Sequence, residues 1–184
     1  VLKHSTTVVL AVNKPRGLVC TNKDPHNPDT IFHLLPSTYE KRRLYCAGRL
    51  DKDSEGLVIL TDDGAFCQKL THPSNGVIKR YRIQLDKPFN PEDIPRLLKG
   101  RRVEGEKLNA HKVIPATRGP HFEKRLEIHL IQGRKREIRR LFDAFGYRVK
   151  RLKRFQIGRF IMKGIAKGGY RKLNSGEIEL LLKK

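Results

Sequence analysis

Short apolar runs recur along the chain and predict a sheet made of several strands. Residues 56–60 read Gly-Leu-Val-Ile-Leu, a continuous apolar run that is typical of a strand buried on both faces. Apolar and polar positions alternate over residues 79–85 and again over residues 125–130, which indicates strands with one buried face. Further strands are expected at residues 8–12, 151–160 and 177–182.

Helical periodicity is clearest over residues 134–145, where four apolar positions fall at i, i+3, i+4 and i+7 and form one stripe. These positions are Ile138, Leu141, Phe142 and Phe145. Gly146 follows at the place of a C-terminal cap. Shorter helices are expected at residues 30–35, at residues 65–70 after the capping sequence Thr-Asp-Asp-Gly, and from Asn90-Pro91 up to Gly100. Residues 22–28 are rich in turn formers and predict a loop.

Strands and helices follow one another without regular βαβ alternation, which favours an α+β fold with a mixed, mostly antiparallel central sheet flanked by helices. The 184 residues suffice for one domain, residues 1–184, or for two lobes of about 1–75 and 76–184 that share a core.

The charge of the chain is strongly unbalanced. Lys and Arg number 40 against 19 Asp and Glu, giving a formal net charge of +21. A compact body with this charge repels itself unless a polyanion is near, and nucleic acid is the commonest such partner. An anionic membrane is the main alternative. No apolar segment approaches the roughly 20 residues that a spanning helix needs, so we expect no membrane partner.

Five cations stand at residues 134–140, in the first turns of the predicted helix. The helix macrodipole favours anions at that end, so this cluster indicates a negatively charged partner. The three cysteines are too few and too far apart for a disulfide framework or a zinc site. Reduced thiols and a cytoplasmic location are the simplest interpretation.

Several kinds of site are missing from the sequence. There is no phosphate-binding loop, no dinucleotide fingerprint, no histidine spacing suited to a metal and no serine-hydrolase elbow, so we expect no cofactor and no metal ion. The remaining candidate is the stretch 48–64, where Asp51 stands two residues after Arg49 and ahead of the apolar run. Taken alone, such an acid is more often a solvated turn residue than a catalytic group.

The sequence from Gly48 to Gly64 resembles the signature of the RsuA-type ribosomal RNA pseudouridine synthases, in which Gly-Arg-Leu-Asp precedes Gly-Leu and an apolar run that ends in Thr-x-Asp-Gly. Four further blocks agree in the family's order, and the resemblance extends from about residue 10 to residue 181. The blocks are Asn13-Lys14-Pro15-Arg16-Gly17, His72-Pro73-Ser74 with Tyr81, residues 133–142, and Arg151-Leu152 with Gly158.

The resemblance implies roles for individual residues. Asp51 matches the aspartate that attacks or deprotonates the ribose, and Tyr81 matches the tyrosine that stacks on the target base and removes its C5 proton. Arg139 matches the basic residue that pairs with the aspartate, Arg49 the arginine that holds the nucleotide out of its helix, and Leu152 an apolar pocket wall. The other cations expected to contact RNA are Lys14, Arg16, Arg134, Arg136 and Arg140.

Isomerisation of uridine needs neither redox chemistry nor net hydrolysis, which agrees with the expected absence of a cofactor. The partner implied is ribosomal RNA or a ribosomal subunit precursor, bound by a monomer. Arg136-Glu137 resembles the branch that acts on large-subunit RNA. Many relatives carry an S4-type RNA-binding domain ahead of the catalytic part. None is visible here, which leaves open whether one precedes Val1 or is not needed.

Two competing functions remain at this point. A catalytically inactive RNA-binding or ribosome-assembly protein would have the same charge, and a DNA-binding regulator is a weaker third possibility. The carboxylate of Asp51 distinguishes an enzyme from either of them.

Overall fold

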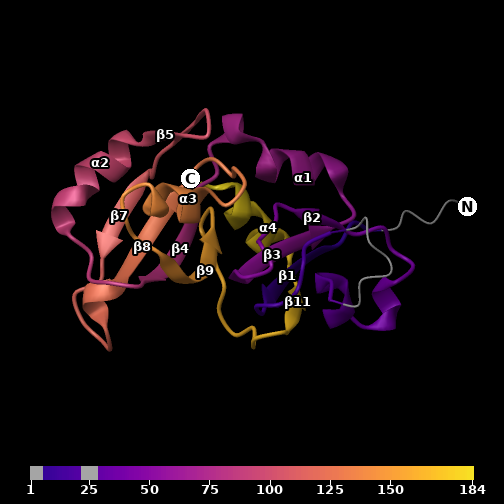
Figure 1. The fold of residues 1–184 in the computed structure, drawn as a ribbon. Helices are drawn as coiled ribbons and strands as arrows, with labels where there is room; N and C mark the ends of the chain where they lie inside the picture. The colour runs from indigo at the N-terminus through magenta and orange to yellow at the C-terminus, as the bar shows by residue number, and fades with distance from the viewer. Residues whose placement is uncertain (1–5, 22–28) are drawn as a thin grey trace, which may run out of the picture.

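The computed structural model describes residues 6–21 and 29–184, and a nine-stranded sheet runs through them (Figure 1). Seven strands follow in the order β11-β1-β3-β9-β4-β8-β7, with β2 paired to β3 and β10 paired to β9. The strands are β1 Val9–Lys14, β2 Tyr45–Ala47, β3 Glu55–Thr61, β4 Lys79–Leu85, β7 Lys112–Pro115, β8 Arg125–Leu130, β9 Val149–Ile157, β10 Phe160–Ile161 and β11 Tyr170–Lys172. Among these pairs β3–β9 is parallel and the others are antiparallel, which confirms the predicted mixed sheet.

Helices cover both faces of the sheet. They are α1 Gly64–Thr71, α2 Ile94–Lys99, α3 Glu137–Asp143 and α4 Ser175–Leu182. Short 3-10 turns lie at Ile31–Leu34, Ser37–Tyr39, Pro73–Asn75, Pro91–Asp93 and Phe122–Lys124. A separate hairpin of β5 Arg101–Val103 and β6 Glu106–Leu108 lies beside α3. No helix in the described part of the chain is both long and apolar enough to cross a membrane.

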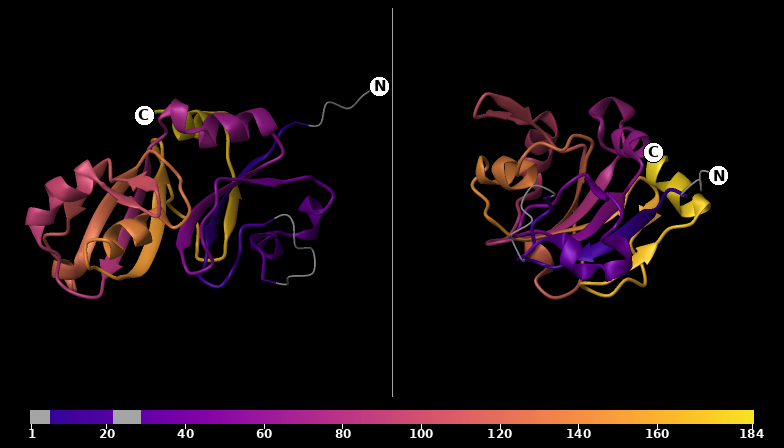
Figure 2. Two further views of the ribbon diagram at one scale, coloured as in Figure 1. Left: turned by 45° about the horizontal axis from the view of Figure 1, so that its top comes forward. Right: turned by 90° about the vertical axis from the view of Figure 1, so that its right-hand side faces the viewer.

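Alternate residues of the central strands enter two hydrophobic cores, one on each face of the sheet. Leu10 of β1 and Val58 of β3 belong to the larger core, which α2 and α3 complete. Ala11 and Ile59 belong to the smaller core, which α1 and α4 cover. In Figure 2 the half that contains β4 and β8 and the half that contains β1 and β3 stand side by side, with α1 lying across one end of the sheet. The sheet is therefore covered on both faces around β1 and β3, whereas β4 and β8 contribute to the larger core alone.

The strongly alternating segments form as predicted. Strands β4 and β8 have the expected bounds, β3 is buried along its whole length, and Asp63 caps α1 by accepting a hydrogen bond from Phe66 N at 2.9 Å. The short helix at residues 30–35 is a 3-10 turn, and the helix begun at Asn90 ends before Gly100. The predicted loop at residues 22–28 lies outside the described residues.

One predicted element is wrong and another is shorter than predicted. Residues 177–182 form helix α4 rather than a strand, because Asn174 and Glu177 make a reciprocal capping box at its start. The helix predicted at residues 134–145 begins only at Glu137, since Arg136 adopts a left-handed conformation at φ 51°. Arg134, Lys135 and Arg136 therefore precede the helix, and the macrodipole argument does not apply to them.

Candidate active site

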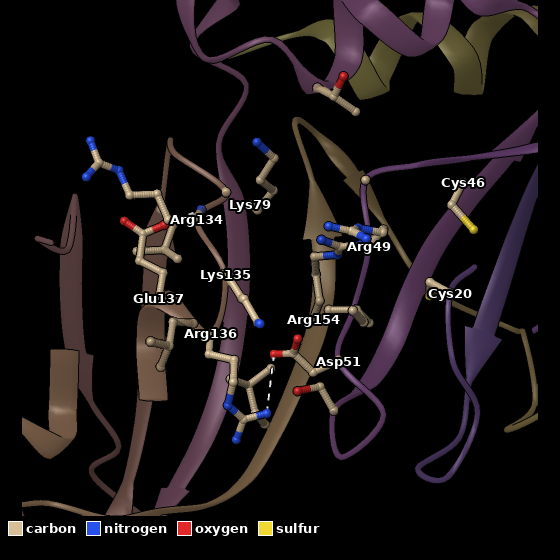
Figure 3. A pocket seen from close by; sticks show the side chains of 18 of the residues that line it. Cys20, Cys46, Arg49, Asp51, Lys79, Arg134, Lys135, Arg136, Glu137 and Arg154 are labelled. Carbon is tan, nitrogen blue, oxygen red and sulfur yellow. Dashed lines mark hydrogen bonds and ion pairs between the residues drawn. The ribbon is translucent and has the colours of Figure 1, made fainter. Parts of the chain in front are cut away.

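A pocket of about 900 Å³ opens where β3, β4 and β9 lie side by side. The loop 48–54 ahead of β3 forms one wall, and residues 133–139 form the opposite wall (Figure 3). Asp51, Tyr81, Arg139 and Leu152 all line this pocket. Residues that are far apart in the sequence thus meet at this pocket on the sheet.

Asp51 lies in a turn closed by the hydrogen bond from Ser54 N to Asp51 O at 3.0 Å. Its side chain is 38% exposed, so the carboxylate is neither buried in the core nor directed into bulk solvent. Arg136 Nη1 lies 3.8 Å from Asp51 Oδ2, and Figure 3 shows the two side chains pointing toward each other. The carboxylate is therefore ion-paired and accessible to a molecule in the pocket.

An aromatic and an aliphatic side chain form the floor of the pocket. Tyr81 of β4 is 7% exposed and packs into the larger core, while Leu152 of the neighbouring strand β9 is 6% exposed. Both residues also line the pocket, so each presents a small apolar surface to it. Such a surface suits the face of a planar base.

The predicted ion pair between Arg139 and Asp51 needs correction. Arg139 lies with Nε 3.4 Å from Asp53 Oδ2, and it donates from Nη2 to Asp53 O at 3.2 Å and from Nη1 to Val149 O at 2.8 Å. In the part of the chain that the structure describes, the cation within 4 Å of Asp51 is Arg136. The carboxylate that holds Arg139 is thus that of Asp53 and not that of Asp51.

Asp53 accepts two hydrogen bonds from Arg136, each of 3.1 Å, in addition to its contacts with Arg139. Burial raises the pKa of Asp53, but the Arg136 hydrogen bonds and the charges of both arginines outweigh it, and the net effect is a lowered pKa. Burial lowers the pKa of Arg139, whereas the hydrogen bonds to Asp53 raise the pKa of Arg136. Asp53 thereby connects the loop of Asp51 to the opposite wall of the pocket.

Lys14 was predicted to contact RNA, and the structure contradicts this. Its side chain is fully buried. Its amine donates to Ser54 O at 2.6 Å, to Pro15 O at 3.0 Å and to Lys52 O at 3.5 Å. Lys14 therefore braces the loop that carries Asp51 from below and presents no charge to a ligand. Burial lowers the pKa of its ammonium group, while nearby acids partly oppose that effect.

The other predicted RNA contacts differ in how free they are. Arg49 is exposed at the rim of the pocket. Arg140 is only 18% exposed and pairs with Glu104 at 3.1 Å and Glu106 at 2.7 Å, while Arg134 lies 4.0 Å from Glu106. The acids of the β5–β6 hairpin thus already pair with Arg140, so its charge is not free for RNA.

A second, smaller pocket of about 500 Å³ adjoins the first and shares Arg136 and Arg139 with it. Its lining is mostly cationic and includes the exposed residues Arg16, Arg148 and Lys150. This second pocket, called the cationic groove below, borders the main pocket along Arg136 and Arg139.

Sequence reasoning missed three buried polar residues of the main pocket. Burial lowers the pKa of Lys79 to about 8, and its amine donates to Ile131 O at 3.2 Å. Burial raises the pKa of Glu137, which accepts a hydrogen bond from Arg134 N at 3.1 Å. Arg154 is 3% exposed and lies beside Tyr81. The alternation over residues 79–85 places Lys79 on the buried face with Tyr81, which is a signal for its burial, whereas Glu137 and Arg154 have no such local signal.

The sequence model of a family described as RNA pseudouridylate synthase matches residues 8–144. Ribosomal large subunit pseudouridine synthase B of Pseudomonas aeruginosa is 36% identical over 179 residues, which cover 97% of this chain and 46% of that protein. Ribosomal small subunit pseudouridine synthase A of Salmonella typhimurium is 34% identical over 169 residues, covering 91% of this chain and 71% of that protein. The chain spans about half the length of the large-subunit relatives it matches, between 46% and 59%.

A solved structure gives the same picture. A crystal structure of pseudouridylate synthase superposes with a TM-score of 0.84 at 30% sequence identity, and the match covers 97% of this chain and 75% of that one. Complexes of an archaeal box H/ACA particle share the fold at 14% identity and a TM-score of 0.57.

Proposed function

The chain belongs to the RNA pseudouridylate synthase family, as its sequence blocks predicted, and from this premise we propose that it isomerises a specific uridine of ribosomal RNA to pseudouridine. The observation that carries the proposal is the pocket in which Asp51, Tyr81 and Leu152 meet from three separate segments. A carboxylate beside an aromatic and an aliphatic wall is the arrangement that this reaction needs.

The reaction breaks the bond between C1′ and N1, turns the uracil in place, and forms a bond between C1′ and C5. The C5 proton leaves, and N1 ends with a proton, so the net change is an isomerisation. Asp51 acts on the ribose, either by attack on C1′ or by removal of a ribose proton. Tyr81 stacks on the base and takes the C5 proton in the last step. Leu152 closes the other side and helps to keep water from the detached base.

The cationic groove supplies the contacts that hold the RNA. Extruding a nucleotide from its stack costs a few kcal/mol, and phosphate contacts offset that cost. Arg49 stands at the rim, where it is suited to hold the nucleotide out of its helix. Arg16, Arg148 and Lys150 are exposed along the second pocket, where the flanking phosphates would pass.

Large-subunit ribosomal RNA, or a precursor of that subunit, is the substrate we propose. The first relatives are named for the large subunit, and Arg136-Glu137 resembles the corresponding branch. We further propose that residues 1–184 act as one catalytic unit with lobes of about 1–75 and 76–184, as a monomer in the cytoplasm.

The proposal is tested by release of tritium from ribosomal RNA labelled at uridine C5. We expect release by the wild-type protein, and loss of release in Asp51→Asn with RNA affinity changed by less than about threefold, because one pocket charge contributes little to phosphate binding. Asp143→Asn is the matched control, since Asp143 is an exposed acid in the second pocket. Failure of the wild-type protein to release tritium from any ribosomal RNA that it binds would instead identify an inactive RNA-binding protein.

A further inference from the structure

Arg154 is a buried cation without an acidic partner. Its side chain lies in the main pocket and is 3% exposed, and its Nε donates to Leu57 O at 2.8 Å. Its Nη2 is buried and finds no hydrogen-bond partner among residues 6–21 and 29–184, and no carboxylate of those residues lies within 4 Å of the guanidinium. A buried charge that lacks a partner costs several kcal/mol, so a ligand that supplies one is the natural explanation for its retention.

The other partly buried arginines at these pockets have acidic partners. Arg139 is 12% exposed and is held by Asp53, and Arg140 is 18% exposed and is held by Glu104 and Glu106. Arg154 is more deeply buried than either, yet the hydrogen-bond acceptor that it contacts is a neutral carbonyl, that of Leu57. Arg139 and Arg140 each also have a buried Nε without a hydrogen bond, so the feature that sets Arg154 apart is that no acid among the described residues pairs with it.

The sheet fixes that place. Arg154 pairs with Gly56 of β3 on one side and with Tyr81 of β4 on the other. A Cβ on Gly56 would lie 2.1 Å from Arg154 O, so only glycine lets β9 approach β3 this closely at φ 110°. The guanidinium carbon lies 6.0 Å from the centre of the Tyr81 ring. Figure 3 shows Arg154 among the pocket side chains, beside the loop of Asp51.

The position next to Tyr81 decides the ligand chemistry. Under the proposed function, on which this inference rests, the base stacks on Tyr81, and Arg154 is close to that base because its guanidinium carbon lies over the same ring at 6.0 Å from the centre. When C1′–N1 breaks, the bonding electron pair leaves with N1, and the uracil becomes an anion whose charge is shared by O2 and O4. We propose that Arg154 donates to a carbonyl oxygen of the target uracil and carries the negative charge of the detached base.

The symmetry of uracil makes one donor sufficient for both halves of the reaction. Rotation about the axis through N3 and C6 exchanges N1 with C5 and, at the same time, O2 with O4. A donor that holds one carbonyl before the rotation holds the other after it. Cytosine carries an amino group at C4, which cannot accept from a guanidinium, so the same contact discriminates against it. Arg154 itself neither makes nor breaks a covalent bond.

The test compares the rate of tritium release at saturating enzyme with RNA affinity and its salt dependence. Arg154→Gln removes the charge but keeps an amide donor for Leu57 O, and Arg154→Lys restores a charge. Arg82→Met is the control, because Arg82 is an exposed cation of β4 that stacks on Phe155 outside the pocket. Removing a donor to a developing anion lowers rates by about 10²–10³.

We expect Arg154→Gln to lose about 100-fold in the rate at saturation and Arg154→Lys to recover at least about tenfold of it, while affinity stays within about threefold of wild type. A wild-type rate in Arg154→Gln overturns the inference. Equal losses in both variants would overturn the charge role. A weaker affinity whose salt slope falls by about 0.7–0.9 would instead make Arg154 a phosphate contact.

Folding is checked by thermal melting of each variant. If Arg154→Gln does not fold, Arg154→Lys decides: wild-type affinity with a reduced rate supports the inference, and weakened affinity at a full rate overturns it. A wild-type protein that releases no tritium would sink the proposed function and this inference together. If the wild-type protein releases tritium and Arg154→Gln releases it at the same rate, this inference fails and the proposed function stands.

Discussion

Asp53 offers the sharpest test of how the pocket is assembled, because it contacts both Arg136, which pairs with Asp51, and Arg139. Its two carboxylate oxygens accept from Arg136 at 3.1 Å each, and Oδ2 also lies 3.4 Å from Arg139 Nε. Asp53→Asn keeps the shape of the side chain but removes its charge and one of its acceptor oxygens. The backbone contact from Arg139 to Asp53 O is untouched by this change.

The two contacts of Asp53 differ in strength. Arg136 and Asp53 are 41% and 38% exposed, so solvent screens their ion pair and its contribution is about 0–1 kcal/mol. Arg139 is 12% exposed, and its Nε forms an ion pair without a hydrogen bond to Asp53 Oδ2, so removing this partly buried charge partner costs about 2 kcal/mol, less than the roughly 3–5 kcal/mol of a fully buried pair. The loss is therefore roughly 2 kcal/mol, which corresponds to about 30-fold if all of it falls on the placement of Arg139.

We expect Asp53→Asn to lower the rate of tritium release at saturating enzyme by about 10- to 30-fold. RNA affinity should stay the same or tighten, because the groove loses a negative charge. Single-turnover release and filter binding measure the two effects, with Asp143→Asn as the control for charge alone. A faster variant would show that Asp53 restrains the arginines away from Asp51 and would refute the positioning role.

The same residue gives a pH dependence with a definite sign. The pKa of Asp53 lies below its ordinary value of 3.8, so the folded protein favours the ionised form. The stability this provides is fully present above the unfolded pKa and is lost as pH falls through the lowered folded pKa. The melting temperatures of wild type and Asp53→Asn should therefore differ near pH 7 and converge below about pH 4. A constant difference across that range would contradict the assignment.

Three further changes test the framework of the site. Lys14→Met should lower the melting temperature by about 4–10 °C, because it leaves buried carbonyls without a donor at a cost of about 1–3 kcal/mol. It should leave the salt slope of RNA binding unchanged, whereas Arg16→Met should lower that slope by about 0.7–0.9. Glu137→Gln should raise the melting temperature at pH 7–8. Burial raises the pKa of Glu137, so the free energy of unfolding of the wild-type protein falls as pH rises from the unfolded pKa of this acid through its folded pKa. An equal gain in melting temperature at pH 4 would contradict this. Gly56→Ala should prevent folding or lower the melting temperature by more than about 8 °C, while Gly64→Ala, with open space at its Cβ, should have little effect.

The elements that the sequence predicted best are those whose signal is local. The alternation in β4 and β8 and the apolar run of β3 each identify a strand without knowledge of its neighbours. Helix α4 was mistaken for a strand because its apolar residues run together, and the capping pair Asn174 and Glu177 was the signal that would have corrected this. Strand β7, which reads Lys-Val-Ile-Pro, is too short to show a pattern of its own and forms by pairing with β8.

The candidate site was predicted only in part, for a related reason. Asp51, Tyr81 and Leu152 followed from the family resemblance, and the pocket contains all of them. The partner of Arg139 and the burial of Lys14 depend on how the loop ahead of β3 folds back against its neighbours. The sequence around a lysine does not show whether its amine contacts a phosphate of a ligand or donates to buried carbonyls, and only the tertiary structure distinguishes these two cases.

The net charge of +21 overstates the number of cations that are free to bind RNA. Arg139 and Arg140 are held by acids, and Lys14 is sealed beneath the loop of Asp51. The salt dependence of RNA binding should therefore report the exposed cations of the groove, such as Arg16 and Lys150, since buried ones release no counterions. The remaining charges serve to place groups around the pocket. We therefore expect RNA affinity and catalysis to depend on different cations of one surface, so variants of the two sets should separate binding from turnover.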